Sequence, residues 1–157
     1  MKVFVVAMSL LAFSCAPKTE AIAGAADQST GNPGPRIALF CVKHLGKKVG
    51  NGECWTLADE SFKSAGALRP GDDMRVWGRV VNPTRESVKP GDVVEFESAR
   101  FSDGIMTGSA HTAVVVSGGN QRNFSIAEQN WGKKTVRIRE MDLTKLVSGK
   151  VVVYRPL

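Results

Sequence analysis

A cysteine that follows a glycine-rich segment is the side chain in this sequence best suited to chemistry. Cys54 comes after Gly-Asn-Gly-Glu at residues 50–53, and the apolar residues behind it recur at helical spacing up to Gly66. This pattern predicts a helix over residues 54–65 that begins at the cysteine and ends before a glycine. Unpaired backbone N–H groups at a helix start favour a thiolate, so Cys54 is a candidate nucleophile. The alternative is a small buried hydrophobe, because free cysteines are often buried.

A nucleophilic thiol needs a base and a polar group that orients the base. One of the two histidines, His111, opens a β-branched run that predicts a strand. A later predicted strand, residues 123–130, ends in Glu-Gln-Asn. Because side chains alternate across a strand, Glu128 and Asn130 should share a face, and pairing with the strand of His111 would bring both to the imidazole. The alternatives are a structural histidine and a polar strand end at the surface.

The remaining pattern supplies elements that would position these side chains. Apolar residues at helical spacing predict a first helix from Pro35 to about Lys47. After the second helix the period changes, and one helical turn over residues 141–146 interrupts a series of strands. The strands are expected at residues 77–81, 93–97, 111–116, 123–130, 135–139 and 150–154. Two helices followed by an antiparallel sheet predict an α+β domain.

Four short motifs follow one another along the chain. They are Gly-Glu-Cys at 52–54 with Ala58 one turn on, Pro-Gly-Asp-Val-Val at 90–94, His-Thr-Ala-Val-Val at 111–115, and Glu-Gln-Asn-Trp at 128–131. Together they resemble the CHAP domain, a family of cysteine, histidine-dependent amidohydrolases/peptidases. CHAP domains are close in fold to the NlpC/P60 papain-like enzymes, so the resemblance implies a papain-like fold with N-terminal helices packed on an antiparallel sheet.

The resemblance also implies an activity and a role for each candidate residue. CHAP domains cleave amide bonds, usually in bacterial peptidoglycan, so we expect a cysteine amidase or endopeptidase of the cell wall. Carried over by position, Cys54 is the nucleophile and His111 is the general base and later the acid. Glu128 matches the orienting acid, and Asn130 matches a polar residue that assists orientation or the oxyanion.

Neither a metal nor another cofactor is expected. Many CHAP domains carry an acidic calcium loop near the first helix, but residues 47–51 here are Lys-Lys-Val-Gly-Asn. A zinc site is a rival interpretation, since the chain has the ligand types. Wide spacing and the absence of paired Cys-x-x-Cys motifs argue against it. Its ligands would be Cys41, His44, Cys54 and His111.

The N-terminus predicts export. Lys2 and the apolar run 3–13 are typical of a signal peptide and too short for a membrane-spanning helix. Cleavage at a signal peptidase site would remove residues 1–23 as the leader. A lipobox-like ending would instead place the cleavage before Cys15, and acylation of Cys15 would anchor the chain to a membrane. Either ending predicts a periplasmic or secreted protein. An oxidising compartment also allows a disulfide between the other two cysteines, which would silence the nucleophile.

Behind the leader, residues 24–34 predict a flexible linker, and residues 35–157 predict a CHAP-like catalytic domain. The formal net charge of +6 is compatible with an anionic polymer. The basic residues are scattered, without the aromatic interleaving of nucleic-acid binders, so no nucleic-acid partner is expected. We expect a monomer acting on peptidoglycan or a peptide. The rivals are a non-catalytic cell-wall or ligand-binding module on the same fold and a thiol amidase with a non-wall peptide substrate.

Overall fold

Two helices precede six strands along the chain, as the sequence predicts. The computed structural model describes residues 31–71, 73, 75–119 and 121–157. A 3-10 turn, Leu143–Lys145, separates the last two strands. The elements are α1 (Gly34–Lys43), α2 (Cys54–Ala65), β1 (Arg79–Val81), β2 (Val93–Phe101), β3 (His111–Ser117), β4 (Asn123–Glu128), β5 (Arg137–Asp142) and β6 (Leu146–Arg155).

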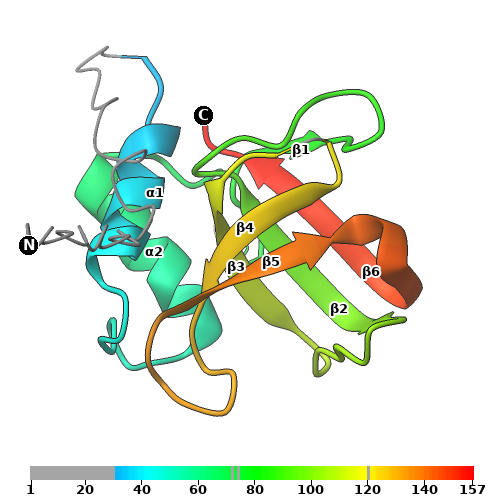
Figure 1. Cartoon of the computed structure of the whole chain (residues 1–157). Coiled ribbons are helices and arrows are strands. Elements are labelled where there is room, and N and C mark those ends of the chain that lie inside the picture. The colour runs from blue at the N-terminus through cyan, green and yellow to red at the C-terminus, as the bar shows by residue number, and fades with distance from the viewer. Residues whose placement is uncertain (1–30, 72, 74, 120) are drawn as a thin grey trace, which may run out of the picture.

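The six strands form one sheet in the order β1-β6-β2-β3-β4-β5, and every neighbouring pair is antiparallel. Figure 1 shows the sheet strongly curved, with α1 and α2 beside each other on one side of it. The α+β prediction is therefore confirmed. Strand β3 lies in the interior of the sheet and contacts both helices, so its first residue, His111, is close to the layer that contains Cys54.

Helix α2 has the limits that the sequence predicts. Glu53, the residue before it, is extended, and Cys54 is the first helical residue. Gly66 ends the helix with a φ of 65°, a left-handed conformation that glycine adopts without a steric cost. Helix α1 ends earlier than expected, at Lys43, because the chain turns at His44 and Leu45 then forms a β-bridge with Val136.

Apolar side chains pack on both faces of the sheet. Val93 and Val114 belong to the cluster that faces the helices, whereas their neighbours Val94 and Val115 belong to a second cluster on the opposite face. Packing on both faces accounts for the continuous apolar run at residues 113–116 of β3 and for the adjacent Val93 and Val94 of β2. The helices contribute fully buried residues to the first cluster, which fixes α2 against the sheet; these include Ile37, Leu57 and Phe62.

A close backbone contact joins the start of α1 to the turn before β2. Gly91 has a φ of 89°, and a Cβ at this position would overlap the backbone of Gly34. We expect Gly91→Ala to lower the free energy of unfolding by about 2–5 kcal/mol, from left-handed strain and overpacking together. The matched control is Gly104→Ala, which has a φ of 88° and open space around it. It should cost only the strain, about 1–2 kcal/mol. If urea denaturation shows that the two variants lose the same free energy of unfolding, the close contact between Gly91 and Gly34 is contradicted.

Two expectations concern residues beyond the described part of the chain. The predicted leader, residues 1–23, with Cys15, and residues 24–30 of the predicted linker lie outside the described residues. The end of that linker is not separate from the domain, since Gly34 already belongs to α1. No helix within the described ranges has the length and hydropathy needed to cross a membrane.

Candidate active site

The structure brings Cys54, His111 and Glu128 together between the start of α2 and the ends of two paired strands. Cys54 is half-buried, and its thiol is hydrogen-bonded to His111 and Thr112. His111 Nε2 lies 2.9 Å from Glu128 Oε2. Strands β3 and β4 are neighbours, and the first residue of β3 thus meets the last residue of β4. Because Nε2 contacts the carboxylate, Nδ1 is the ring nitrogen left to face the sulfur.

The surroundings of these three groups favour their charged forms. Burial raises the pKa of the Cys54 thiol, but the hydrogen bonds from His111 and Thr112 outweigh burial and hold this pKa below 9.0. Burial lowers the pKa of His111, yet its bonds to Cys54 and Glu128 raise this pKa to about 9. Burial also opposes ionisation of Glu128, but bonds from His111 and Arg139 hold its pKa at about 2. These shifts favour a thiolate–imidazolium pair beside a carboxylate over the neutral forms of the cysteine and the histidine.

Two arginines that sequence reasoning missed bind the buried carboxylate of Glu128. Arg137 donates to Oε1 from Nε at 2.9 Å and from Nη2 at 2.6 Å. Arg139 donates to Oε1 from Nε at 2.7 Å and to Oε2 from Nη2 at 3.3 Å. The two arginines stand two residues apart on β5, and therefore on one face of the strand next to Glu128. The spacing of two residues within a predicted strand, together with a charge opposite to that of Glu128, was the signal in the sequence that could have identified them.

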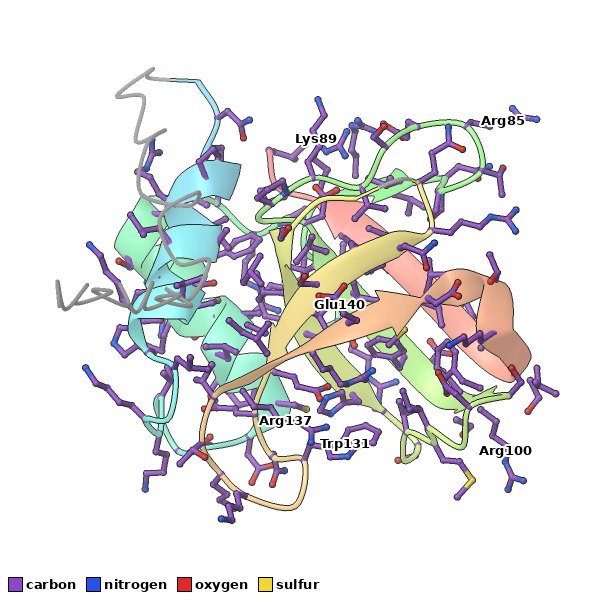
Figure 2. The ribbon with its side chains drawn as sticks, viewed as in Figure 1. Arg85, Lys89, Arg100, Trp131, Arg137 and Glu140 are labelled. Carbon is purple, nitrogen blue, oxygen red and sulfur yellow. The ribbon has the colours of Figure 1, made fainter. Side chains whose placement is uncertain are left out.

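Asn130 does not share a face with Glu128, and this expectation is wrong. Strand β4 ends at Glu128, and Asn130 has a φ of 63°, so strand alternation does not reach it. The Asn130 amide donates to Glu53 Oε2 at 2.8 Å instead, at the residue before the cysteine. The ring next to the imidazole is Trp131, whose centroid lies 5.2 Å from that of His111 in an edge-to-face arrangement. Figure 2 shows Trp131 and Arg137 close together near the start of β5.

Gln129 ties the loop before Cys54 to the end of β4. It is fully buried, and its Oε1 accepts a hydrogen bond from the Val49 N–H at 3.1 Å. Its Nε2 donates to the carbonyl oxygens of Val49 at 2.9 Å and Glu53 at 2.7 Å. A buried amide with both ends bonded across two segments fixes their relative position. Gln129 therefore helps to hold the sulfur against the end of the sheet where His111 lies.

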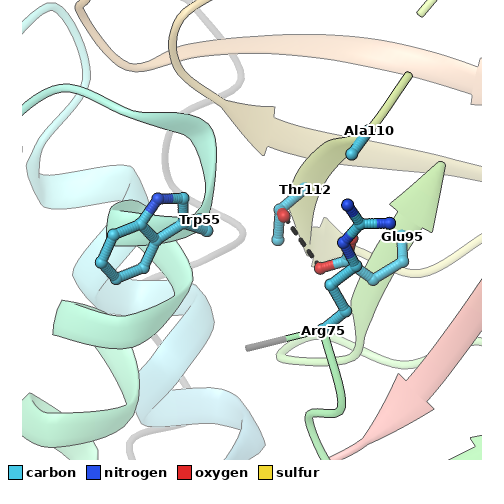
Figure 3. A pocket seen from close by; sticks show the side chains of 5 residues that line it. All are labelled: Trp55, Arg75, Glu95, Ala110 and Thr112. Atoms are coloured by element: carbon cyan, nitrogen blue, oxygen red, sulfur yellow. Dashed lines mark hydrogen bonds between the residues drawn. The ribbon is translucent and has the colours of Figure 1, made fainter. Parts of the chain in front are cut away.

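A pocket of about 140 Å³ opens next to Trp55 and Thr112, the residues that follow Cys54 and His111 in the sequence (Figure 3). Thr112 lines it and is hydrogen-bonded to the Cys54 thiol, and its hydroxyl donates to Glu95 Oε1 at 2.8 Å. Trp77 does not line it: this ring is fully buried and donates from Nε1 to the same Glu95 oxygen at 2.6 Å. The lining residues are Trp55, Arg75, Glu95, Ala110 and Thr112.

The four residues of the rival zinc interpretation do not assemble. Cys41 is fully buried in the core, and burial raises the pKa of its thiol to about 12. His44 stacks on Phe40, and its Nδ1–H donates to the Phe40 carbonyl oxygen at 2.8 Å. Within the described ranges, His, Cys, Asp and Glu side chains form no group of three or more that could hold a metal ion. Cys41 and Cys54 are both free thiols, so no disulfide silences the nucleophile.

Comparison with known proteins corrects the expected biology. A family model described as the AIM3/BBC1 cysteine proteinase-fold domain matches residues 17–157. A relative from Debaryomyces hansenii, Altered inheritance of mitochondria protein 3, is 30% identical over 148 residues, which cover 79% of this chain and 16% of the relative. The chain thus spans only a small part of that protein's length.

These matches overturn the prediction of an exported peptidoglycan amidase or endopeptidase. The matching family is not the CHAP domain, and the relative is a yeast protein named for mitochondrial inheritance. The expectations of a cell-wall substrate, a signal peptide and a periplasmic or secreted location are therefore wrong. The family match also begins at residue 17, inside the segment interpreted as a leader. The papain-like, cysteine proteinase fold implied by the resemblance is confirmed. The chain belongs to the AIM3/BBC1 cysteine proteinase-fold domain family.

Proposed function

We propose that this domain is a cysteine peptidase or amidohydrolase that cleaves an amide bond of a peptide substrate through Cys54. The observation that carries the proposal is the hydrogen-bonded series Cys54–His111–Glu128, in which His111 and Glu128 are buried. A nucleophile, a base and a group that orients the base are the minimum set for acyl transfer by a thiol. The family's cysteine proteinase fold supports the same assignment.

In the proposed reaction, the Cys54 thiolate attacks the carbonyl carbon and forms a C–S bond. The imidazolium of His111 then gives its proton to the leaving nitrogen as the C–N bond breaks. His111, now neutral, takes a proton from water, and the resulting hydroxide attacks the thioester. The C–S bond breaks, the carboxylic acid leaves, and the thiolate–imidazolium pair is restored. The backbone N–H of Cys54 at the start of α2 is the proposed donor to the oxyanion.

The roles of the surrounding residues follow from their contacts. Glu128 fixes the orientation of the His111 ring and stabilises its positive charge. The Trp131 ring packs against the imidazole in an edge-to-face arrangement, which limits the freedom of the imidazole to rotate. Asn130 is assigned no contact with the reacting atoms; its bond to Glu53 supports the residue that precedes the nucleophile.

The first test is the pH dependence of alkylation by iodoacetamide, with each cysteine followed by peptide mass spectrometry. Cys54 should react about tenfold faster at pH 6.5 than it does in the urea-unfolded chain, because its lowered pKa leaves more thiolate. The rate should fall only as the pH drops through that lowered pKa. Cys41 is the internal control: it is fully buried and should stay unlabelled in the folded protein.

Hydrolysis is tested with a mixture of synthetic peptides, with Cys54→Ser as the inactive control. New fragments should appear only with the native sequence, and their rate of formation should decline above about pH 9 as His111 loses its proton. If Cys54 in the folded protein reacts no faster than an unfolded thiol, the nucleophile is not activated. The domain would then be a non-catalytic binding module.

A further inference from the structure

Glu95 is a buried carboxylate without a direct counter-ion. Its exposed fraction is 4%, and burial is the largest influence on its pKa, which is raised. Both of its hydrogen bonds come from neutral donors, Trp77 Nε1 and Thr112 Oγ1, and both end on Oε1. Among the described residues, no cation forms an ion pair with Glu95; Arg75 and His111 act on its pKa only at longer range. A buried charge is costly unless it is paired, so its second oxygen, Oε2, is suited to bind a cation.

Glu95 belongs to the lining of the pocket described above. The pocket is lined by Trp55, which follows the cysteine, and by Thr112, which follows His111 and is bonded to both the thiol and Glu95. A substrate whose carbonyl lies at the sulfur would therefore place a neighbouring group in this pocket. At about 140 Å³, the pocket has room for the end of one side chain and not for a larger structure.

The other lining residues are compatible with a cationic guest. Figure 3 shows Trp55 on one side of the pocket and Glu95 with Arg75 on the other. An aromatic ring and a carboxylate that line the same pocket are a combination that attracts ammonium and guanidinium groups. Arg75 is exposed and has no direct ion pair with Glu95, so its side chain can move toward solvent at little cost. A neutral amide would leave the carboxylate without a counter-charge, and an anion would be repelled by it.

We propose that this pocket binds a positively charged substrate group, the ammonium or guanidinium of a basic side chain next to the scissile bond, with Glu95 as its counter-ion. The inference rests on the proposed function and adds a substrate class to it. Glu95 would act as a specificity residue that contacts substrate away from the reacting atoms. The bonds from Trp77 and Thr112 hold its carboxylate in place for this role.

Peptidyl chloromethyl ketones that alkylate Cys54 test the proposal without a known substrate. The reagents are acetyl-Lys-Gly and acetyl-Gly-Lys chloromethyl ketones, each paired with a counterpart in which norleucine replaces lysine. Within each pair the lysine and norleucine side chains have similar length and differ in charge. Across the two pairs, this side chain is placed on the first or the second residue before the chloromethyl ketone. In the native sequence, the second-order rate should favour lysine by about tenfold to a hundredfold in one of the two pairs.

Substitutions separate the pocket from the general attraction of a thiolate for cations. Glu95→Gln keeps an acceptor oxygen for Trp77 and Thr112 but removes the charge, and should bring the lysine-to-norleucine ratio close to one. Arg75→Gln removes a competing cation at an exposed position and should raise the ratio. Glu97→Gln is the matched control on the same strand; its Oε1 lies 3.6 Å from exposed Lys150 Nζ, and the ratio should not change.

Three results would overturn the proposal. Equal rates for lysine and norleucine, with iodoacetamide still labelling Cys54 rapidly, would remove the cation pocket and leave the proposed function standing. A lysine preference that survives Glu95→Gln while Arg75→Gln has no effect would assign the preference to the thiolate alone. A Cys54 that no reagent labels, iodoacetamide included, would overturn the proposed function and the pocket with it.

Discussion

Replacing His111 with Gln is expected to slow peptide hydrolysis about 10³- to 10⁴-fold, because one side chain serves as both the acid and the base. The same change should remove the reactivity of Cys54 at mildly acidic pH. The hydrogen bond from His111 is the first of the interactions that lower the pKa of the thiol, and burial, which remains, raises it. We expect the alkylation rate at pH 6.5 to fall by about tenfold to a hundredfold as the thiolate fraction drops.

Two controls make this result specific. His44→Gln changes the other histidine, which packs on Phe40 at the end of α1, and should leave the reactivity of Cys54 unchanged. In the His111→Gln protein, alkylation of Cys54 should recover at high pH, where the thiol ionises without help, and this recovery shows that the sulfur is still accessible. Unchanged alkylation at pH 6.5 would mean that the helix start alone activates the cysteine.

The parts of the site that local sequence could predict are those at the ends of secondary structure elements. Cys54 was recognisable because glycines precede it and Gly66 closes the helix that it begins. His111 was recognisable as the first residue of a predicted strand, and Glu128 as one of the three polar residues that end another. Their meeting required that β3 and β4 pair, which strands that follow each other along the chain commonly do.

The missed features depend on tertiary contacts or on a local departure from regular backbone. The prediction assumed that side chains continue to alternate up to Asn130, but the strand ends at Glu128 and the backbone at Asn130 is left-handed. Trp131 therefore lies beside the imidazole where Asn130 was expected. Gln129 bonds to Val49 and Glu53, which are distant in sequence, and no spacing rule connects them. Arg137 donates to Glu128 from β5, and the register in which β5 pairs with β4 cannot be read from a single sequence.

The error about biology has a different origin. The cell-wall substrate came from the resemblance to one family, whereas the residues themselves indicated only acyl transfer by a thiol. A Cys-His-acid arrangement on a papain-like fold is compatible with many amide substrates, so fold and site do not select among them. The apolar N-terminal run then supported a bacterial interpretation, although that run lies outside the described residues. The fold and the meeting of Cys54, His111 and Glu128 were therefore predictable from the sequence, whereas the substrate and the location were not.

Replacing Glu128 with Gln is expected to lower the free energy of unfolding by about 3–5 kcal/mol at pH 7, as for other buried ion pairs that lose one partner. Glu128 is fully buried and accepts from His111, Arg137 and Arg139, so its charge compensates three cationic groups. Glutamine keeps the shape, but its NH₂ group would face one of these donors. If its oxygen stays with the arginines, His111 must become neutral to accept the amide hydrogen at Nε2.

The loss should depend on pH in a direction that the pKa values determine. Glu128 has a pKa of about 2 in the folded protein and an ordinary value of 4.5, so it stabilises the fold above pH 4.5, and this contribution disappears as the pH falls toward 2. His111, raised from 6.5 to about 9, stabilises the fold below pH 6.5 and loses that contribution as the pH rises through 9. The stability difference between native sequence and variant should therefore be largest between about pH 4.5 and 6.5.

Urea denaturation from pH 2.5 to 9.5 measures this difference, with Glu140→Gln as the matched control. Glu140 is exposed and lies on the neighbouring strand, where its Oε1 accepts from Ser125 Oγ at 2.7 Å, so its substitution should change stability by less than about 0.5 kcal/mol. Alkylation reports the catalytic side of the same change: without the carboxylate the imidazolium is less stable, and Cys54 should need a higher pH to react. A Glu128→Gln protein that is as stable as the native sequence and keeps its alkylation profile would contradict an ionised carboxylate at this position. Loss of stability with an unchanged profile would instead make Glu128 a partner of the arginines alone, and the orientation of His111 would then rest on Trp131.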